Sequence, residues 1–262
     1  MKAKLELNFY KYQGTGNDFI LFDNRSNFFP KEDTSLVAFL CDRRFGIGAD
    51  GLILLENHES SDFKMVYYNS DGNQSTMCGN GGRCIVAFAK NLNIIDSETN
   101  FMAVDGIHHA SIEGTIVKLQ MIDVSDIQSR EKYSFLNTGS PHHVQLVSDL
   151  DNLEVQLEGA KIRYGIYGKE GSNVNFVSQL NDDTFSIRTY ERGVEGETLS
   201  CGTGVTAVAL AMFQNQKTKS NQIKVVTKGG ELRVNFSSKG SVYNNVQLIG
   251  DASLVFKGSI SC

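Results

Sequence analysis

The sequence predicts an α+β protein made of two similar halves, each rich in β-strands and built around one buried helix. Three observations support this prediction: a cysteine–glycine motif that occurs in each half, many short alternating segments, and two strongly apolar helical segments. The motif reads TMCGNGGRC at 76–84 and LSCGTGVT at 199–206, and the two cysteines lie about half a chain length apart. The matching positions indicate an internal duplication.

The predicted strands are segments in which apolar and polar residues alternate, a pattern typical of half-buried strands. They lie at 20–22, 52–55, 63–68, 117–121, 143–147, 173–177, 184–189, 224–227, 232–236 and 245–249. The chain has 25 glycines but only 2 prolines, which suits tight connections between central strands. Gly229 and Gly230 separate two of these segments and predict a hairpin turn.

The predicted helices are fewer. Asp33 or Thr34 should cap a short helix over 35–41, because short polar side chains accept hydrogen bonds from the unpaired N–H groups of a first turn. The two clearest helices follow the motifs, over 81–91 and 204–214, and are apolar on nearly every side. Such helices are buried, so each half should enclose one. The best boundary between the halves is the polar stretch 122–130.

The composition excludes several classes of protein. The 262 residues carry a net charge of −5 without a Lys/Arg cluster, which argues against a nucleic-acid partner. No stretch approaches the ~18 apolar residues of a membrane span, and the opening is too short and polar for a secretory signal. Five cysteines in such a chain indicate reduced thiols and a cytoplasmic protein. A zinc site is not expected, because the sequence has no C-x-x-C pair and its histidines lack finger-like spacing.

Each duplicated cysteine, Cys78 and Cys201, stands at the start of a predicted helix. The helix dipole and the unpaired N–H groups favour a thiolate there and also bind a carboxylate. Two such thiols suit the inversion of a stereocentre, because a base on one face must work with an acid on the other. The same N–H groups would stabilise a carbanion as an oxyanion hole does. No cofactor motif is evident, so no cofactor is expected.

Other interpretations of the motif stay open at this point. A single Cys-Gly-x-Gly is usually a buried thiol beside a turn, and two facing cysteines could form a redox pair if their geometry allowed a disulfide. Cys84 lies about 240° around an ideal helix from Cys78 and is expected in the core. Cys41 and Cys262 are expected to be structural or incidental.

The remaining motifs are weaker. GIGADG at 46–51 matches a dinucleotide fingerprint but has a helix before it and a strand after it, the reverse of what that site needs. GTGND at 14–18 predicts a turn, and the position of Asn17 and Asp18 between two strand-like segments could instead make it a loop that faces a ligand. His142 follows Pro141 and could be held beside a thiol. Arg192, next to Glu191, could pair with a carboxylate.

Together these motifs resemble those of the diaminopimelate epimerases over essentially the whole chain. The matching segments are GTGNDF (14–19), CDRRFGIGADGLI (41–53), NSDGNQSTMCGNGGRC (69–84), GSPHHV (139–144), NVNF (173–176) and YERGVEGETLSCGTG (190–204). Several long motifs in the right order are much more specific than any one of them.

The resemblance implies a fold and an activity. It implies two pseudo-symmetric domains, each a curled, mainly antiparallel, barrel-like sheet around a central helix, with the last strand returning to the first domain. The expected domains are 1–124 with 251–262, and 125–250. The implied activity is the interconversion of LL- and meso-diaminopimelate without pyridoxal phosphate, in lysine and cell-wall synthesis. A homodimer is also implied.

The resemblance assigns roles to individual residues. Cys78 and Cys201 would be the acid/base thiols, and His142 and Glu191 would tune their pKa values. The reacting carboxylate would be bound by the backbone N–H groups of Gly79, Asn80, Gly202 and Thr203. The substrate site would be lined by the side chains of Asn17, Asn69, Asn173, Glu191 and Arg192. Two positions depart from the family pattern, Ser140 where many members have Asn and Gly51 where some have Gln.

Two rival hypotheses accompany this interpretation. A proline racemase-like enzyme would also use two thiols, but on a substrate with one amino-acid head, against which Arg192 and the asparagines argue. A ligand-binding protein or thiol switch on the same fold would lack turnover.

Overall fold

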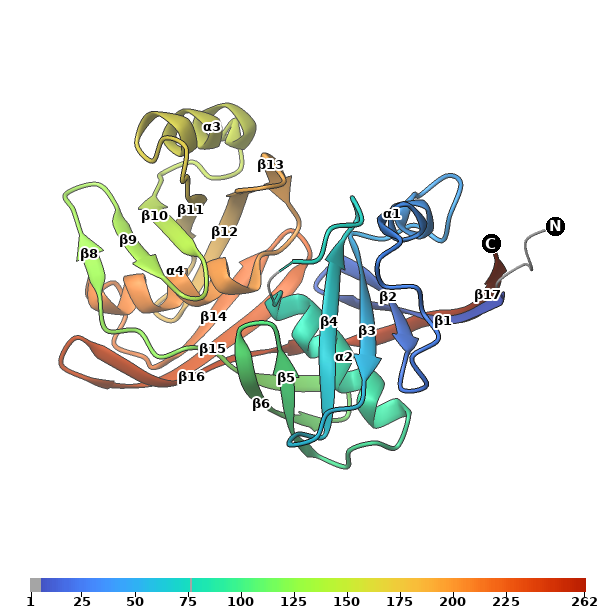
Figure 1. Ribbon diagram of the computed structural model, residues 1–262. Helices are drawn as coiled ribbons and strands as arrows, with labels where there is room; N and C mark the ends of the chain where they lie inside the picture. Colours follow the sequence, from blue (N-terminus) through green and yellow to red (C-terminus); the bar gives the residue numbers. More distant parts are fainter. Residues whose placement is uncertain (1–5, 76) are drawn as a thin grey trace. The chain divides into compact units, whose positions relative to one another are not determined.

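The computed structural model describes residues 6–75 and 77–262, so residues 1–5, part of the opening considered above as a signal, lie outside the description. The chain divides into two units, Met1–Leu119 with Asp251–Cys262, and Gln120–Gly250. Figure 1 shows both. The expected domains, 1–124 with 251–262 and 125–250, remain a prediction.

The first unit is a mainly antiparallel sheet around helix α2. Its strands pair in the order β17–β1–β2–β3–β4–β5–β6–β7, with β2–β3 and β4–β5 parallel and the other pairs antiparallel. Helix α2 packs against strands β1 to β4, β6 and β17, so the sheet curls around it (Figure 1). The elements are β1 (Glu6–Gly14), β2 (Asn17–Asp23), α1 (Thr34–Cys41), β3 (Gly51–Glu56), β4 (Phe63–Asn69), α2 (Gly79–Asn91), β5 (Glu98–Ala103), β6 (Gly106–Glu113), β7 (Ile116–Gln120) and β17 (Ser253–Ser261).

The second unit has the same plan around helix α4. Its strands pair in the order β8–β9–β10–β11–β12–β14–β15–β16, with β10–β11 and β12–β14 parallel and the others antiparallel. Strand β13 forms a hairpin with β12. The elements are β8 (Ile127–Ser129), β9 (Ser134–Asn137), β10 (Pro141–Leu146), α3 (Val155–Gly165), β11 (Asn173–Gln179), β12 (Thr184–Glu191), β13 (Gly196–Thr198), α4 (Gly202–Gln214), β14 (Gln222–Thr227), β15 (Gly230–Lys239) and β16 (Val242–Asp251).

The order of connections repeats between the units. Strands β1 to β4 correspond to β9 to β12, α1 to α3, α2 to α4, and β5 to β7 correspond to β14 to β16. The parallel pairs fall at the same places in both lists. The predicted fold class, two pseudo-symmetric halves with a central helix each, is therefore confirmed. The hairpin at Gly229 and Gly230 is confirmed as well, since β14 pairs with β15 across it.

The two central helices are buried as predicted, and each begins two residues earlier than expected. Helix α1 begins at Thr34, and Asp33 caps it by accepting from the Leu36 N–H, so Asp33 rather than Thr34 is the cap. Cys84 is fully buried in the core. Burial raises the pKa of the Cys41 thiol to about 12 and raises that of Cys84 further, which keeps both protonated.

The sequence analysis missed helix α3. Gly159 in its middle weakens the helical pattern, yet the structure requires a glycine there, because an added Cβ would lie 2.4 Å from Tyr190 Cβ. The duplication itself predicts this helix, since α1 occupies the corresponding position in the first unit. Several strands were also missed, namely β1, β5, β6, β8, β9, β13 and β17.

Candidate active site

The start of α2 brings four of the predicted site residues together. Cys78 is the N-cap of this helix, so Gly79 and Asn80 form its first turn with their N–H groups directed outward. The Cys78 thiol donates to Asn17 Oδ1 at 3.7 Å, and Asn80 Nδ2 donates to the same oxygen at 3.2 Å. The Asn17 amide is held in this orientation because its Nδ2 donates to Asp50 Oδ2 at 2.6 Å.

A buried cation lies in the same helix. The guanidinium of Arg83 is fully buried, and its hydrogen bonds go to uncharged acceptors: Thr15 Oγ1 at 3.1 Å, the Gly79 carbonyl at 3.4 Å and the Asp251 carbonyl at 3.5 Å. Burial lowers the pKa of Arg83, while the nearby thiols Cys84 and Cys78 oppose that shift. A buried charge is costly without a counter-charge, so Arg83 favours negative charge close to Cys78.

The start of α4 has the same backbone plan with different side chains around it. Cys201 is the N-cap, and Gly202 and Thr203 form the first turn. The Cys201 sulfur lies 3.4 Å from Thr203 Oγ1, and that oxygen lies 2.9 Å from His142 Nε2. The structure thus brings together His142, Thr203 and Cys201.

His142 is fully buried on β10. Burial, helped by the positive charge of Arg192, lowers the pKa of His142 to about 3, so its imidazole is neutral at physiological pH. Its Nδ1 lies 3.1 Å from Asn175 Nδ2. Asn175, a fully buried residue of β11, was not singled out by the sequence analysis.

Asn173 connects the segments that carry Ser140 and Arg192. Its Nδ2 donates to Ser140 Oγ at 2.9 Å and to the Pro141 carbonyl at 3.1 Å, while its Oδ1 accepts from the Arg192 N–H at 2.9 Å. Both hydrogens on Nδ2 and the oxygen Oδ1 of the Asn173 amide therefore have protein partners. Asn173 therefore positions the Arg192 backbone, and Ser140 takes part through its hydroxyl.

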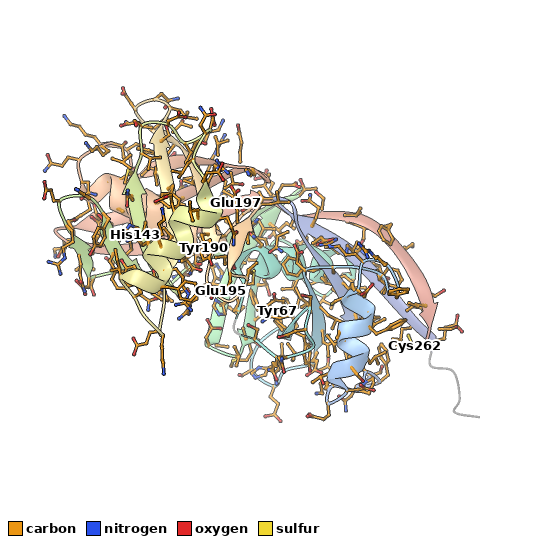
Figure 2. The ribbon with its side chains drawn as sticks, turned by 90° about the horizontal axis from the view of Figure 1, so that it is seen from above. Tyr67, His143, Tyr190, Glu195, Glu197 and Cys262 are labelled. Carbon is orange, nitrogen blue, oxygen red and sulfur yellow. The ribbon has the colours of Figure 1, made fainter. Side chains whose placement is uncertain are left out.

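Glu191 and Arg192 stand at the end of β12, where the chain turns toward β13. Figure 2 labels Tyr190, Glu195 and Glu197 on this hairpin. Glu195 has a positive φ of 55° and pairs with Arg163 of α3 at 3.2 Å, while Tyr190 Oη donates to it at 3.1 Å. Helix α3 thus holds the turn that carries Glu191 and Arg192.

Asn69 is the last residue of β4. It is exposed at the end of β4, directly opposite Gly51 of β3. A Cβ at Gly51 would lie 2.6 Å from Tyr67 Cε2, so a side chain there would force the ring of Tyr67, labelled in Figure 2, to move. The glycine at position 51, where some family members have Gln, therefore leaves space for the ring of Tyr67.

The residues that sequence reasoning missed are polar groups buried in the core. Arg83 and Asn175 lie within apolar patterns, where a charged or amide side chain is normally read as facing solvent. A signal was present in NVNF, because asparagine is disfavoured in strands and this segment has two, Asn173 and Asn175.

Among residues 6–75 and 77–262, no helix has the length and apolar character to cross a membrane. Within that same part of the chain, no cluster of three or more His, Cys, Asp or Glu residues is arranged to hold a metal ion.

Solved structures define the class of fold. A phenazine biosynthesis protein of the PhzF family from Bacillus anthracis superimposes with a TM-score of 0.78 at 11% identity, over 98% of this chain and 99% of that one. A hydroxyproline epimerase from Agrobacterium vitis, with bound trans-4-hydroxy-L-proline, gives 0.71 at 14% identity, over 100% of this chain and 94% of that one. The fold is therefore the two-domain fold of these proteins.

Sequence relationships are narrower. The family model for diaminopimelate epimerase matches residues 9–120 and 134–255. A diaminopimelate epimerase from Flavobacterium psychrophilum is 62% identical over 253 residues, which is 96% of this chain and 99% of that protein. One from Chlorobaculum tepidum is 43% identical over 258 residues, 95% of this chain and 99% of that protein. The chain belongs to the diaminopimelate epimerase family.

Proposed function

We infer that this protein is a diaminopimelate epimerase, an isomerase that interconverts LL- and meso-diaminopimelate and so serves lysine biosynthesis. The observation that carries this inference is the 62% identity to a named family member over 96% of the chain. The presence of both duplicated cysteines at helix N-termini supports it.

We propose that Cys78 and Cys201 act as the two acid/base groups. One thiolate removes the α-proton from one face of the carbon, the electron pair moves into the carboxylate, and the other thiol returns a proton to the opposite face. The N–H groups of Gly79, Asn80, Gly202 and Thr203 would bind that carboxylate and stabilise the added charge. Each turnover exchanges the protonation states of the two thiols, so no other reactant is consumed.

The remaining predicted site residues are proposed to recognise the second amino-acid head of the substrate. Arg192 would contribute a cation. Asn17, Asn69 and Glu191 would contribute polar contacts, and Asn173 would act by holding Arg192 in place. Glu191 and His142 would also influence the thiol pKa values.

We also propose that the protein is a cytoplasmic homodimer. Strand β17, the last of the chain, presents three exposed apolar side chains, Leu254, Val255 and Phe256. Apolar surface of this kind is typical of contacts between proteins, and a second copy of this chain would cover it. Analytical ultracentrifugation of the wild type and of Phe256→Ser would test the homodimer, which predicts that the substitution increases the monomer fraction.

Proton NMR of LL-diaminopimelate with the reduced protein in D₂O tests the activity. Loss of the α-proton signal with appearance of the meso form is the expected result. Unchanged signals over hours, with reduced thiols, would contradict the inference, and exchange of proline instead would favour the racemase alternative.

A further inference from the structure

We propose that the Thr203 hydroxyl, oriented by the ring of His142 and the amide of Asn175, donates a hydrogen bond to the Cys201 sulfur and stabilises its thiolate. Thr203 and Asn175 are then positioning residues whose side chains bias the protonation of one thiol. The effect of the Thr203 hydroxyl on Cys201 is measurable without any substrate. This inference rests on the proposed function only where it concerns the role of Cys201 in turnover.

The first step is the orientation of the Asn175 amide. Its Nδ2 lies 3.0 Å from the backbone carbonyl of His143, which can only accept a hydrogen bond. Its Oδ1 accepts from Thr189 Oγ1 at 3.0 Å. Both contacts place the nitrogen toward β10, so the amide cannot be reversed without opposing two oxygens.

The second step is the position of the proton on His142. The second hydrogen of Asn175 Nδ2 faces His142 Nδ1 at 3.1 Å, and an amide nitrogen is only a donor. Nδ1 must therefore be the acceptor, and the single ring proton of the neutral imidazole lies on Nε2. His142 Nε2 then donates to Thr203 Oγ1 at 2.9 Å.

The third step is the direction of the Thr203 hydroxyl. Since its oxygen accepts from His142, its own hydrogen is available for the Cys201 sulfur at 3.4 Å. A hydroxyl donor stabilises a thiolate more than a neutral thiol. Every bond in the chain from Thr189 through Asn175, His142 and Thr203 thus points its hydrogen toward Cys201.

The surrounding packing holds this chain in place. A Cβ at Gly204 would lie 2.5 Å from Asn175 Oδ1, so the glycine of the motif allows β11 to approach the helix. Thr138 Oγ1 donates to the Thr203 carbonyl at 2.8 Å and fixes the backbone of that residue. Asn175 and His142 are fully buried, so water does not compete for their contacts.

Several charged or titratable groups lie on the elements next to Cys201 and helix α4. The end of β12 carries Glu191 and Arg192. The strands that pack against α4 carry His142 and His143 on β10, Lys224 on β14, and Glu231, Arg233 and Lys239 on β15. None of these is changed by the substitutions below, so their influence is the same in every variant.

The test measures the pH dependence of Cys201 alkylation by iodoacetamide in the full chain, with Cys201 peptides followed by mass spectrometry. The parent carries Cys78→Ala and Cys262→Ser, because Cys262 is exposed and would react. In Thr203→Val the midpoint pH of Cys201 alkylation should rise by about one to two pH units. This is the size expected for loss of a hydrogen bond to a charged group. Thr203→Ser should keep the parent midpoint.

Thr206→Val is the matched control. Thr206 is a fully buried residue of the same helix, and its hydroxyl donates to the Gly202 carbonyl at 3.0 Å rather than toward the sulfur. Its midpoint should stay within about 0.3 pH unit of the parent, a difference worth less than about 0.5 kcal/mol. A Thr203→Val midpoint equal to the parent would overturn the proposal.

Nitrogen-15 NMR of His142 provides a second, independent test. In the wild type the ring proton should lie on Nε2 throughout pH 5 to 8. In Asn175→Leu, which removes the donor to Nδ1, the proton should be shared between Nδ1 and Nε2. A proton on Nδ1 would overturn the proposal even if Thr203→Val does not fold. A shifted Cys201 midpoint in a protein without epimerase activity would leave this inference standing and refute the proposed function instead.

Discussion

The starts of α2 and α4 have the same backbone framework but opposite surroundings. Each has a cysteine as N-cap followed by Gly-x-Gly. Five residues after the cysteine, α2 has the buried guanidinium of Arg83 and α4 has the buried hydroxyl of Thr206. Cys78 faces an amide oxygen, which favours its protonated form, while Cys201 faces a hydroxyl.

This difference shows two ways to stabilise negative charge at a helix N-terminus. Near Cys78, a buried cation acts on a sulfur that donates to the Asn17 amide oxygen, a group that can only accept a hydrogen bond. Near Cys201, a neutral histidine and a hydroxyl act through oriented dipoles. Epimerisation in both directions requires each cysteine to exist as a thiol and as a thiolate. Unequal surroundings allow one cysteine to be a thiolate while the other is a thiol.

The largest expected effect comes from removing either thiol. Cys78→Ala and Cys201→Ala should each lower epimerase turnover by about 10²- to 10⁴-fold, the usual contribution of an acid/base group. In D₂O each variant should exchange the α-proton of one stereoisomer only, and the two variants should choose opposite isomers. Exchange of the same isomer by both variants would contradict a two-face mechanism. Cys262→Ser, at an exposed position, serves as the control.

Arg83→Met sharpens the comparison between the two helices. Loss of the buried cation should raise the midpoint of Cys78 alkylation by about one to two pH units, while the midpoint of Cys201 stays unchanged. Arg83→Lys should recover part of the shift because it keeps a charge, although its ammonium cannot reproduce three directional contacts. If Cys78 alkylation is unaffected in a folded Arg83→Met protein, the role of Arg83 is structural.

Acid should destabilise the second unit more than the first. Burial lowers the pKa of His142 to about 3 and that of His143 to about 4, from an ordinary value of 6.5. Between these values the unfolded chain binds protons that the folded unit does not, so the free energy of unfolding falls as pH falls below about 6.5, by up to about 1.4 kcal/mol per pH unit for each histidine.

Hydrogen exchange between pH 4 and 7 would measure this loss of protection unit by unit. His143→Gln should remove about half of the pH dependence in Gln120–Gly250. An identical pH dependence in this variant and the wild type would refute the assignment. Exchange in the first unit provides the internal reference.

The smallest expected effect is at Ser140. Ser140→Ala removes one of the two acceptors of Asn173 Nδ2, and the Pro141 carbonyl remains. Because Asn173 holds the Arg192 backbone, KM for diaminopimelate should rise about fivefold, equivalent to about 1 kcal/mol, while kcat changes little. Ser237→Ala on the exposed part of β15 is the control, and a loss confined to kcat would contradict a positioning role.

Sequence reasoning identified the elements whose pattern is local. The apolar helices after Cys78 and Cys201 were recognisable because burial on all sides leaves no polar stripe. Helix α3 was missed because Gly159 is required by the packing of Tyr190 rather than by its own segment. Comparison of the two halves was the remaining clue, since a duplicated chain repeats its helices as well as its motifs.

By itself, the sequence determined the duplication, the two helix-capping cysteines and the family, because these depend on residue types at fixed spacings along the chain. Only the tertiary structure showed that the buried Arg83 has no charged hydrogen-bond acceptor among the described residues, and that Asn175 orients His142. The reason is that burial and hydrogen-bond direction depend on which strands pack against a helix. A polar residue in an alternating segment has the same sequence pattern whether it faces water or another strand's side chain.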